Sequence, residues 1–215
     1  MLINVDKIYN SILVENPYKH AVINGLIDLQ EINALITTMP TDTFNHVSRH
    51  DGSDKTYRVH NNIIYSLENQ AHMKDLHSKW ISLTNDLISI EYRQAISDSI
   101  GFNVNDLFIE ITLKKYVIND YISPHTDRSC VPVTHVIFLN PHWEKNWGGE
   151  FCILESEFKM VKEIIPTWDN SVLFRQSENS WHSVNPCKVP NVSRIGLQVA
   201  FWSSQEKPVF PGRNE

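Results

Sequence analysis

The sequence lacks several features that would place it in particular classes of protein. It has no apolar run of the roughly 18 residues that a membrane-spanning helix needs. Its first residues show no basic region followed by an apolar stretch, as a secretory signal would. The three cysteines are widely spaced and form no Cys-x-x-Cys motif, so we expect neither a disulfide framework nor a thiolate zinc site. These absences predict a cytoplasmic protein with no membrane partner.

The sequence also carries fewer basic than acidic residues. Lysine and arginine number 19 against 25 aspartates and glutamates, and the net charge is -6. We therefore expect no nucleic-acid partner, because such partners need a basic surface. The sequence also lacks a Gly-x-Ser-x-Gly elbow, a P-loop, a Gly-x-Gly-x-x-Gly motif and a His-Glu-x-x-His motif, which leaves little support for the chemistries that those motifs carry.

The composition that remains is that of a globular protein. The chain has 215 residues, of which 41% are hydrophobic and 20% charged, so we expect a single domain over residues 1–215. Residues 1–105 are helical in character, and residues 106–205 are rich in β-branched and aromatic residues between turn signals. Many short strands with regular turns predict a sandwich or barrel, braced by the N-terminal helices, and not a parallel α/β sheet.

The pattern of apolar residues predicts the individual elements. Helical spacing occurs over residues 28–39 and 73–87, with Gly101 as the stop for the latter helix or for a second one from about Glu91. The polar residues 41–55 predict a loop. The predicted strands are Tyr57–Tyr65, Leu107–Ile118, Pro132–Leu139, Glu150–Leu154, Ser171–Phe174 and Arg194–Trp202.

Ten histidines invite a search for metal ligands. His125 and Asp127 form a His-x-Asp pair just after a long predicted strand, and residues i and i+2 of an extended chain point to the same side. The two side chains can therefore approach one metal ion, although a surface turn would look the same. His135 shares the parity of its apolar neighbours Val133 and Ile137, so we expect a buried strand histidine there and not a ligand.

A third ligand candidate is His182, which lies among apolar neighbours after a predicted strand. Two histidines and one carboxylate leave three positions open on octahedral iron(II), the arrangement found in facial-triad oxygenases. Three open positions suit a co-substrate that chelates through two oxygens while dioxygen takes the third.

Strand Arg194–Trp202 alternates cleanly between two faces. An arginine and a glutamine beside two small residues predict a roomy polar pocket on one face, although a solvent-exposed face would look similar. The guanidinium of Arg194 would pair with the distal carboxylate of the co-substrate. The apolar face holds Ile195, Leu197, Val199 and Phe201, and the other face holds Arg194, Gly196, Gln198 and Ala200.

Taken together, these motifs resemble the iron(II)/2-oxoglutarate dioxygenases, in their prolyl-4-hydroxylase-like branch. The resemblance covers roughly residues 106–203 and rests on motifs whose order and spacing match. They are Tyr116 nine residues before His125, the strand from Thr134 to Leu139-Asn140, Gly148-Gly149-Glu150, Phe174 before His182-Ser-Val184, Arg194, and Phe201-Trp202.

The resemblance implies a mainly β fold with some α, namely a double-stranded β-helix (jelly roll) core. It implies iron(II) held by His125, Asp127 and His182, with 2-oxoglutarate as co-substrate, dioxygen as oxidant, and Arg194 on the 5-carboxylate. The implied reaction is hydroxylation of an unactivated C–H bond with release of succinate and carbon dioxide. The carboxylate at Asp127 favours this outcome over halogenation, because related halogenases carry a small residue there.

Three positions depart from the family pattern. Asn119 stands where a glycine is common, and asparagine tolerates the same left-handed turn. Phe138 and Gly196 stand where some members carry hydroxyl groups, so the co-substrate would need a second contact from elsewhere. Tyr116 and Thr134 are the candidates for that contact, although a packed core tyrosine and an ordinary strand threonine would look the same.

The substrate is less constrained than the reaction. The segment 45–55 and Arg58 would fold over the site, or form a solvated loop. We favour a small metabolite or amino-acid-like substrate, with a protein prolyl residue as the alternative. Two other classes remain open: a metal-binding jelly-roll protein without 2-oxoglutarate turnover, and a cupin-type metal enzyme. The presence of Arg194 weighs against the first, and the spacing of His135 and His142 against the second.

Overall fold

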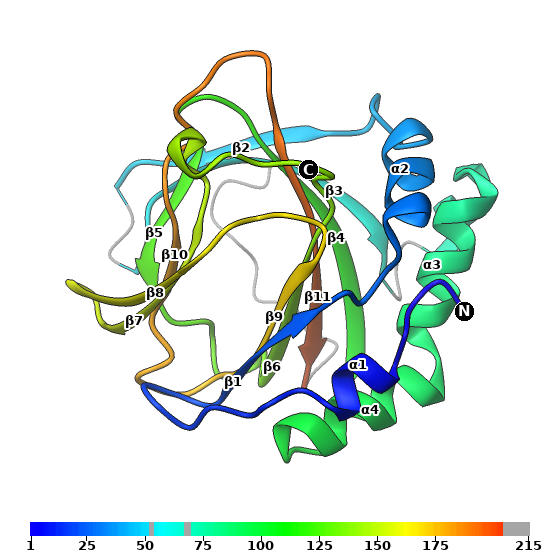
Figure 1. The fold of residues 1–215 in the computed structure, drawn as a ribbon, viewed down its shortest axis with the longest axis horizontal. Coiled ribbons are helices and arrows are strands. Elements are labelled where there is room, and N and C mark those ends of the chain that lie inside the picture. Colours follow the sequence, from blue (N-terminus) through cyan, green and yellow to red (C-terminus); the bar gives the residue numbers. More distant parts are fainter. Residues whose placement is uncertain (52–53, 67–69, 204–215) are drawn as a thin grey trace.

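A computed structural model describes residues 1–51, 54–66 and 70–203. Its strands form one continuous, antiparallel sheet that curls round on itself, and the helices gather on one side of it (Figure 1). The strands run in the order β1-β9-β6-β11-β4-β3-β5-β10-β7-β8, with β2 paired to β3. This mainly β, jelly-roll architecture with few helices is the predicted fold class.

The helices lie largely where the sequence predicts them. Segment 28–39 forms α2, and segment 73–87 divides into a 3-10 turn and α3. Gly101 adopts a left-handed conformation with φ +64° and ends α4. None of the helices in the described ranges is long and apolar enough to cross a membrane. The helices are α1 Asp6–Tyr9, α2 Leu29–Thr37, α3 Ser78–Ile88 and α4 Ile90–Ile100, with 3-10 turns at Gln70–Asp75 and Lys145–Trp147.

All six predicted strands are present, but the sheet contains five more. The prediction of a loop over residues 41–55 is wrong in part, because β2 lies within it. The side chains of β2 are mostly exposed, so it has no alternating apolar pattern to reveal it. The strands are β1 His20–Asn24, β2 Asn45–Arg49, β3 Tyr57–Tyr65, β4 Phe108–Tyr116, β5 Tyr121–His125, β6 Val133–Phe138, β7 Phe151–Ser156, β8 Lys159–Ile164, β9 Asn170–Arg175, β10 His182–Val184 and β11 Arg194–Trp202.

Strand β11 separates the core from the interior of the curled sheet. It lies between β4 and β6 and pairs with both along most of its length. Its apolar face, from Ile195 to Phe201, belongs to the main core together with Trp80 of α3 and Tyr92 of α4. Its other face lines a cavity. Both halves of the predicted alternation are therefore confirmed, and the helices brace the side of the sheet that faces away from the cavity.

His135 is a buried structural residue, as predicted. Its Nδ1 lies 2.8 Å from the Tyr92 hydroxyl and its Nε2 lies 3.0 Å from the Ser171 hydroxyl. Ser171 in turn donates to the Ile23 carbonyl at 3.3 Å, so its oxygen accepts from Nε2–H while Nδ1 accepts from the tyrosine. The neutral ring thus links α4, β6, β9 and β1, and burial lowers the pKa of His135 to about 3.

We predict that His135→Gln makes the free energy of unfolding less dependent on pH. The folded pKa lies below the unfolded value of about 6.5, so the unfolded state binds the extra proton and stability falls as the pH drops from about 6.5 towards 3. This histidine contributes up to about 1.4 kcal/mol per pH unit in that window. Urea unfolding of both proteins across the window measures the difference, and parallel pH profiles would contradict it.

Candidate metal centre

The pairing of β5 with β10 creates the centre of the site. His125 is the last residue of β5 and lies directly opposite His182, the first residue of β10. The turn that leads from β4 into β5 passes through Asn119, whose φ of +65° is the left-handed conformation expected there. Strand pairing thus brings together two histidines that are far apart in the sequence.

Asp127 completes a group of three ligand atoms. Its Oδ1 lies 3.7 Å from Nε2 of His125 and 3.8 Å from Nε2 of His182, and the three ligand atoms all lie within 4.8 Å of one another. Both histidines are buried. The structure therefore brings together the three predicted ligands in a geometry that can hold one metal ion.

Hydrogen bonds fix the tautomers of the two histidines. Nδ1 of His125 lies 2.9 Å from the Ser123 carbonyl, and Nδ1 of His182 lies 2.9 Å from the Ser180 carbonyl. A carbonyl can only accept, so each Nδ1 carries the proton and each Nε2 presents its lone pair towards Asp127. Such backbone partners are typical of metal-binding histidines, because they orient the ring and raise its basicity.

The surroundings favour the protonation states that a metal needs. Burial and the neighbouring His182 hold the pKa of His125 well below its usual value. Burial also lowers the pKa of His182, although Asp127 opposes this. For Asp127, burial acts to raise the pKa, but His182, Lys55 and a hydrogen bond from Thr134 outweigh it, so the pKa is lowered. Neutral imidazoles and an ionised carboxylate are the forms that bind iron(II).

Thr134 holds the carboxylate of Asp127. Its hydroxyl donates to Oδ2 at 2.9 Å, and the Gln176 side chain donates to the Asp127 carbonyl at 3.2 Å. These bonds leave Oδ1 pointing at the histidines. The sequence suggested Thr134 as a contact for 2-oxoglutarate; its hydroxyl lines the same cavity, and its partner among the described residues is a metal ligand.

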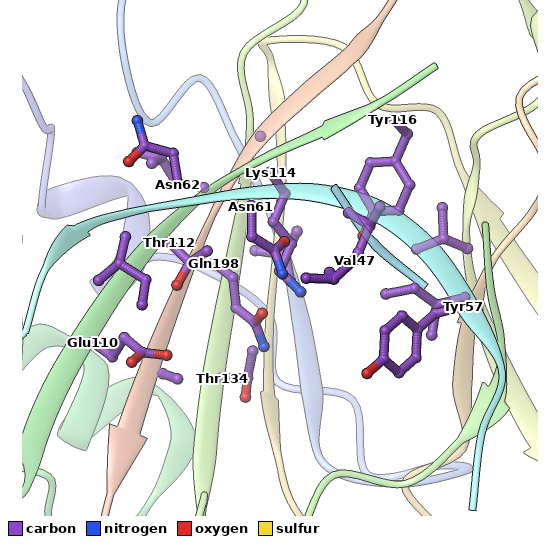
Figure 2. A pocket seen from close by; sticks show the side chains of 18 of the residues that line it. Val47, Tyr57, Asn61, Asn62, Glu110, Thr112, Lys114, Tyr116, Thr134 and Gln198 are labelled. Carbon is purple, nitrogen blue, oxygen red and sulfur yellow. The ribbon is translucent and has the colours of Figure 1, made fainter. Parts of the chain in front are cut away.

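The ligands lie in the wall of a cavity of about 1580 Å³. Figure 2 shows Glu110, Thr112, Lys114 and Tyr116 of β4 along one side of it, near Gln198 of β11. The segment expected to fold over the site does line it, through β2 and the residues that follow. Arg58 is not among the lining residues, and it pairs instead with Asp120 at 3.6 Å.

Arg194 is a buried cation in the same cavity. It is 2% exposed, and its guanidinium lies over the rings of Tyr116 and Phe138, at 4.5 and 5.1 Å from their centroids. Within the described ranges it forms no ion pair, and its Nε has no hydrogen-bond partner. A buried charge without a counter-charge is costly, so this site fits a carboxylate ligand. The residues present therefore fit both a metal ion and a 2-oxoglutarate molecule.

Two neighbouring features shape the floor around Arg194. Burial raises the pKa of Tyr116 to about 12, so its phenol stays neutral and can donate to a carboxylate. Gly148 and Gly149 both have φ +73°; a Cβ on Gly148 would lie 2.1 Å from the Pro186 carbonyl, and one on Gly149 would lie 3.2 Å from Cδ of the arginine. No side chain fits at Gly148, and at Gly149 the left-handed backbone favours glycine.

Sequence reasoning did not single out two lysines in the cavity, although Lys55 ends the segment that was expected to fold over the site. Lys55 and Lys114 are both partly buried and both influence Asp127 electrostatically. Burial and the neighbouring Lys55 lower the pKa of Lys114 to about 8, and burial lowers the pKa of Lys55 against the opposing influence of Asp127 and Asp54. The alternation of β4 places Lys114 on the inner face together with Tyr116, and this shared parity is the signal that could have found it.

We predict that Thr134→Val weakens metal binding by about tenfold or more, because the bond that orients a ligand carboxylate is lost. Competition with a chelator for manganese(II) measures the affinity. Thr112→Val is the matched control, since Thr112 lines the same cavity and has no hydrogen bond to Asp127. Equal affinities of the two variants would show that the Thr134 bond does not support the metal.

Comparison with known proteins agrees with this geometry. Residues 111–203 match the family model of the 2OG-Fe(II) oxygenase superfamily. The prolyl 3-hydroxylase OGFOD1 of Mus musculus is 23% identical over 147 residues, which cover 66% of this chain and 27% of that protein. The chain spans less than a third of the length of the curated relatives that it matches.

Solved structures share the fold. A prolyl-4-hydroxylase from Pseudomonas putida superposes with a TM-score of 0.60 at 16% identity, covering 92% of this chain and 96% of that one. A prolyl hydroxylase from Trichoplax adhaerens, in complex with a peptide fragment of the hypoxia inducible factor oxygen degradation domain, has a TM-score of 0.60 at 18% identity, over 94% of this chain and 93% of that one. The matched residues include every predicted metal ligand, so the segment that carries the metal centre is similar to the 2OG-Fe(II) oxygenase superfamily, and the fold is shared with solved prolyl hydroxylases.

Proposed function

We propose that this chain hydroxylates a prolyl residue of a peptide or protein, using iron(II), 2-oxoglutarate and dioxygen. The observation that carries the proposal is the presence, in one cavity, of the three metal ligands and the buried guanidinium of Arg194, which forms no ion pair within the described residues and whose Nε has no hydrogen-bond partner. A protein that only bound metal would have no use for that arginine. When bound, iron(II) and 2-oxoglutarate would activate dioxygen, of which one oxygen atom would convert a C–H bond into C–OH and the other would enter succinate as carbon dioxide is released.

The protein's own residues bind, orient and exclude water. His125, Asp127 and His182 hold the metal on one side and leave its other positions open. Arg194 takes the distal carboxylate of the co-substrate, and Tyr116 lies beneath the guanidinium, able to donate to the same group. The buried surroundings keep the imidazoles neutral and strengthen each of these polar contacts, because water competes less for them.

The choice of a prolyl substrate rests on the relatives. The sequence alone favours a small metabolite, whereas the OGFOD1 relatives and several structural neighbours are named as prolyl hydroxylases, and one neighbour is in complex with a peptide. The cavity, at about 1580 Å³, exceeds the roughly 300–1,000 Å³ of a usual small-molecule pocket and has room for a peptide segment beside the co-substrate.

The three cysteines support a reducing location. Cys130, Cys152 and Cys187 are all free thiols, and two of them are buried. We therefore propose a cytoplasmic location, where thiols remain reduced.

The proposal predicts that iron-loaded protein adds one oxygen atom to proline-containing peptides. Mass spectrometry locates the oxygen, and succinate release from 2-oxoglutarate should match it in amount. Asp127→Ala should abolish both signals, because two histidines alone leave the metal without its charged ligand. Hydroxylation that survives in this variant would rule out the assigned metal centre. Succinate release with pooled metabolites but with no peptide would return the preference to a small substrate.

We also predict that Arg194→Ala raises the dissociation constant of 2-oxoglutarate at least about tenfold, since a two-pronged charged contact is lost. Arg194→Lys should restore only part of the affinity, because an ammonium replaces a planar fork. Calorimetric titration of manganese-loaded protein measures both, and metal affinity should be unchanged in each variant. An unaltered affinity for 2-oxoglutarate in the alanine variant would show that another residue anchors it.

A further inference from the structure

Two lysines from separate parts of the chain meet in the cavity beside the metal ligands. Lys55 lies in the connection between β2 and β3. Lys114 lies on β4, where its backbone is opposite Asn61 of β3 and Gly196 of β11. Both lysines line the cavity, and Figure 2 shows Lys114 beside Asn61 and near Tyr116.

Neither ammonium group has a hydrogen bond or an ion pair with any other residue in the described ranges. The carboxylates near them have other roles. Asp54 pairs with Arg49, and Asp127 is a metal ligand. Glu110, four residues from Lys114 on the same strand, favours the charged form of that lysine without forming an ion pair with it. In the part of the chain that the structure describes, neither ammonium group is therefore within ion-pair distance of a carboxylate.

Binding of iron(II) and 2-oxoglutarate would leave the positive charge of the two lysines less well balanced. The two positive charges of iron(II) and the one on Arg194 balance Asp127 and the two carboxylates of 2-oxoglutarate. Once the metal takes up the charge of Asp127, each lysine loses one of the anions that favour its charged form, and Asp54 and Glu110 are the ones that remain. Two neighbouring, partly buried cations are then left without a directly paired carboxylate, an arrangement that an additional anion would stabilise.

We propose that Lys55 and Lys114 bind a carboxylate of the primary substrate, at a second anion site distinct from the one that Arg194 provides for 2-oxoglutarate. This inference rests on the proposed oxygenase function and narrows its substrate class. The substrate carries a carboxylate close to the carbon that is hydroxylated. That group is either the α-carboxylate of a free amino acid or the side chain of an acidic residue next to the target proline.

Matched acid and amide probes test the site without turnover. The first pair consists of two peptides that carry Asp or Asn beside a proline. The second pair consists of free proline and prolinamide. In a further set of both pairs, leucine replaces proline. Calorimetry measures their binding to protein loaded with manganese(II) and 2-oxoglutarate. The unaltered protein should bind the acid of at least one pair about tenfold more tightly than its amide. The pair that shows this preference identifies the source of the carboxylate.

The variant Lys114→Met removes the charge and keeps the length of the side chain. It should reduce the preference for the acid to about one, whereas Lys115→Met should leave it unchanged. Lys115 is the matched control because it is the next residue of the same strand and its ammonium lies over the Phe44 ring, 5.7 Å from the centroid, outside the cavity. If Lys114→Met does not fold, Lys55→Met in the connecting segment provides the same test.

Two results would overturn the inference. Equal binding of every acid and its amide by the unaltered protein would mean that no second anion site exists. A Lys114→Met protein that keeps the preference but binds 2-oxoglutarate more weakly would assign this lysine to the co-substrate. The proposed function can fail independently of the second anion site. Hydroxylation of neutral prolyl peptides, without a preference for the acid, would support the function and reject the anion site. A preference for the acid that is confined to the leucine pairs, with no hydroxyproline formed, would support the anion site and reject prolyl hydroxylation.

Discussion

The short antiparallel pairing between β5 and β10 is the constraint on which the rest of the site depends. It sets His125 opposite His182, and every other part of the metal centre is arranged around that pair. Asp127 follows two residues after the first histidine, and Thr134 on a different strand fixes its carboxylate. The orientation of the two rings is fixed locally, because each Nδ1 donates to the carbonyl two residues earlier in its own chain segment.

A second feature of the cavity is a buried positive charge without a counter-charge among the described residues. Arg194 is almost completely enclosed, and aromatic rings rather than carboxylates surround its guanidinium. A protein interior normally satisfies such a group. The free-energy cost of burying this charge is offset when a ligand carboxylate pairs with it. The cavity therefore favours negatively charged ligands whatever their shape. The helices support this arrangement from outside, since the opposite face of β11 packs into the main core.

Much of this site could be predicted from the sequence, because its signals are local. Alternation along β11 assigned each residue to the core or to the cavity, and the His-x-Asp spacing placed two ligands on one side of the chain. Strands such as β2 and β10 could not be predicted, since one is exposed and the other has only three residues. The lysines of the cavity were not singled out. Lys114 shares the face of Tyr116, two residues further along β4, and this parity could have distinguished it from Lys115.

The sheet order has a consequence for how the domain is delimited. Residues 111–203 carry the family match, yet β3 pairs with β4 and β5 inside the sheet, and β1 pairs with β9 at one end of the strand order. A protein trimmed to the matched segment would keep all the metal ligands and lose the neighbours of three strands. It would also expose the core face of β11, from which α3 and α4 would be missing. The smallest unit that can fold and bind metal is therefore much larger than the segment by which the family is recognised.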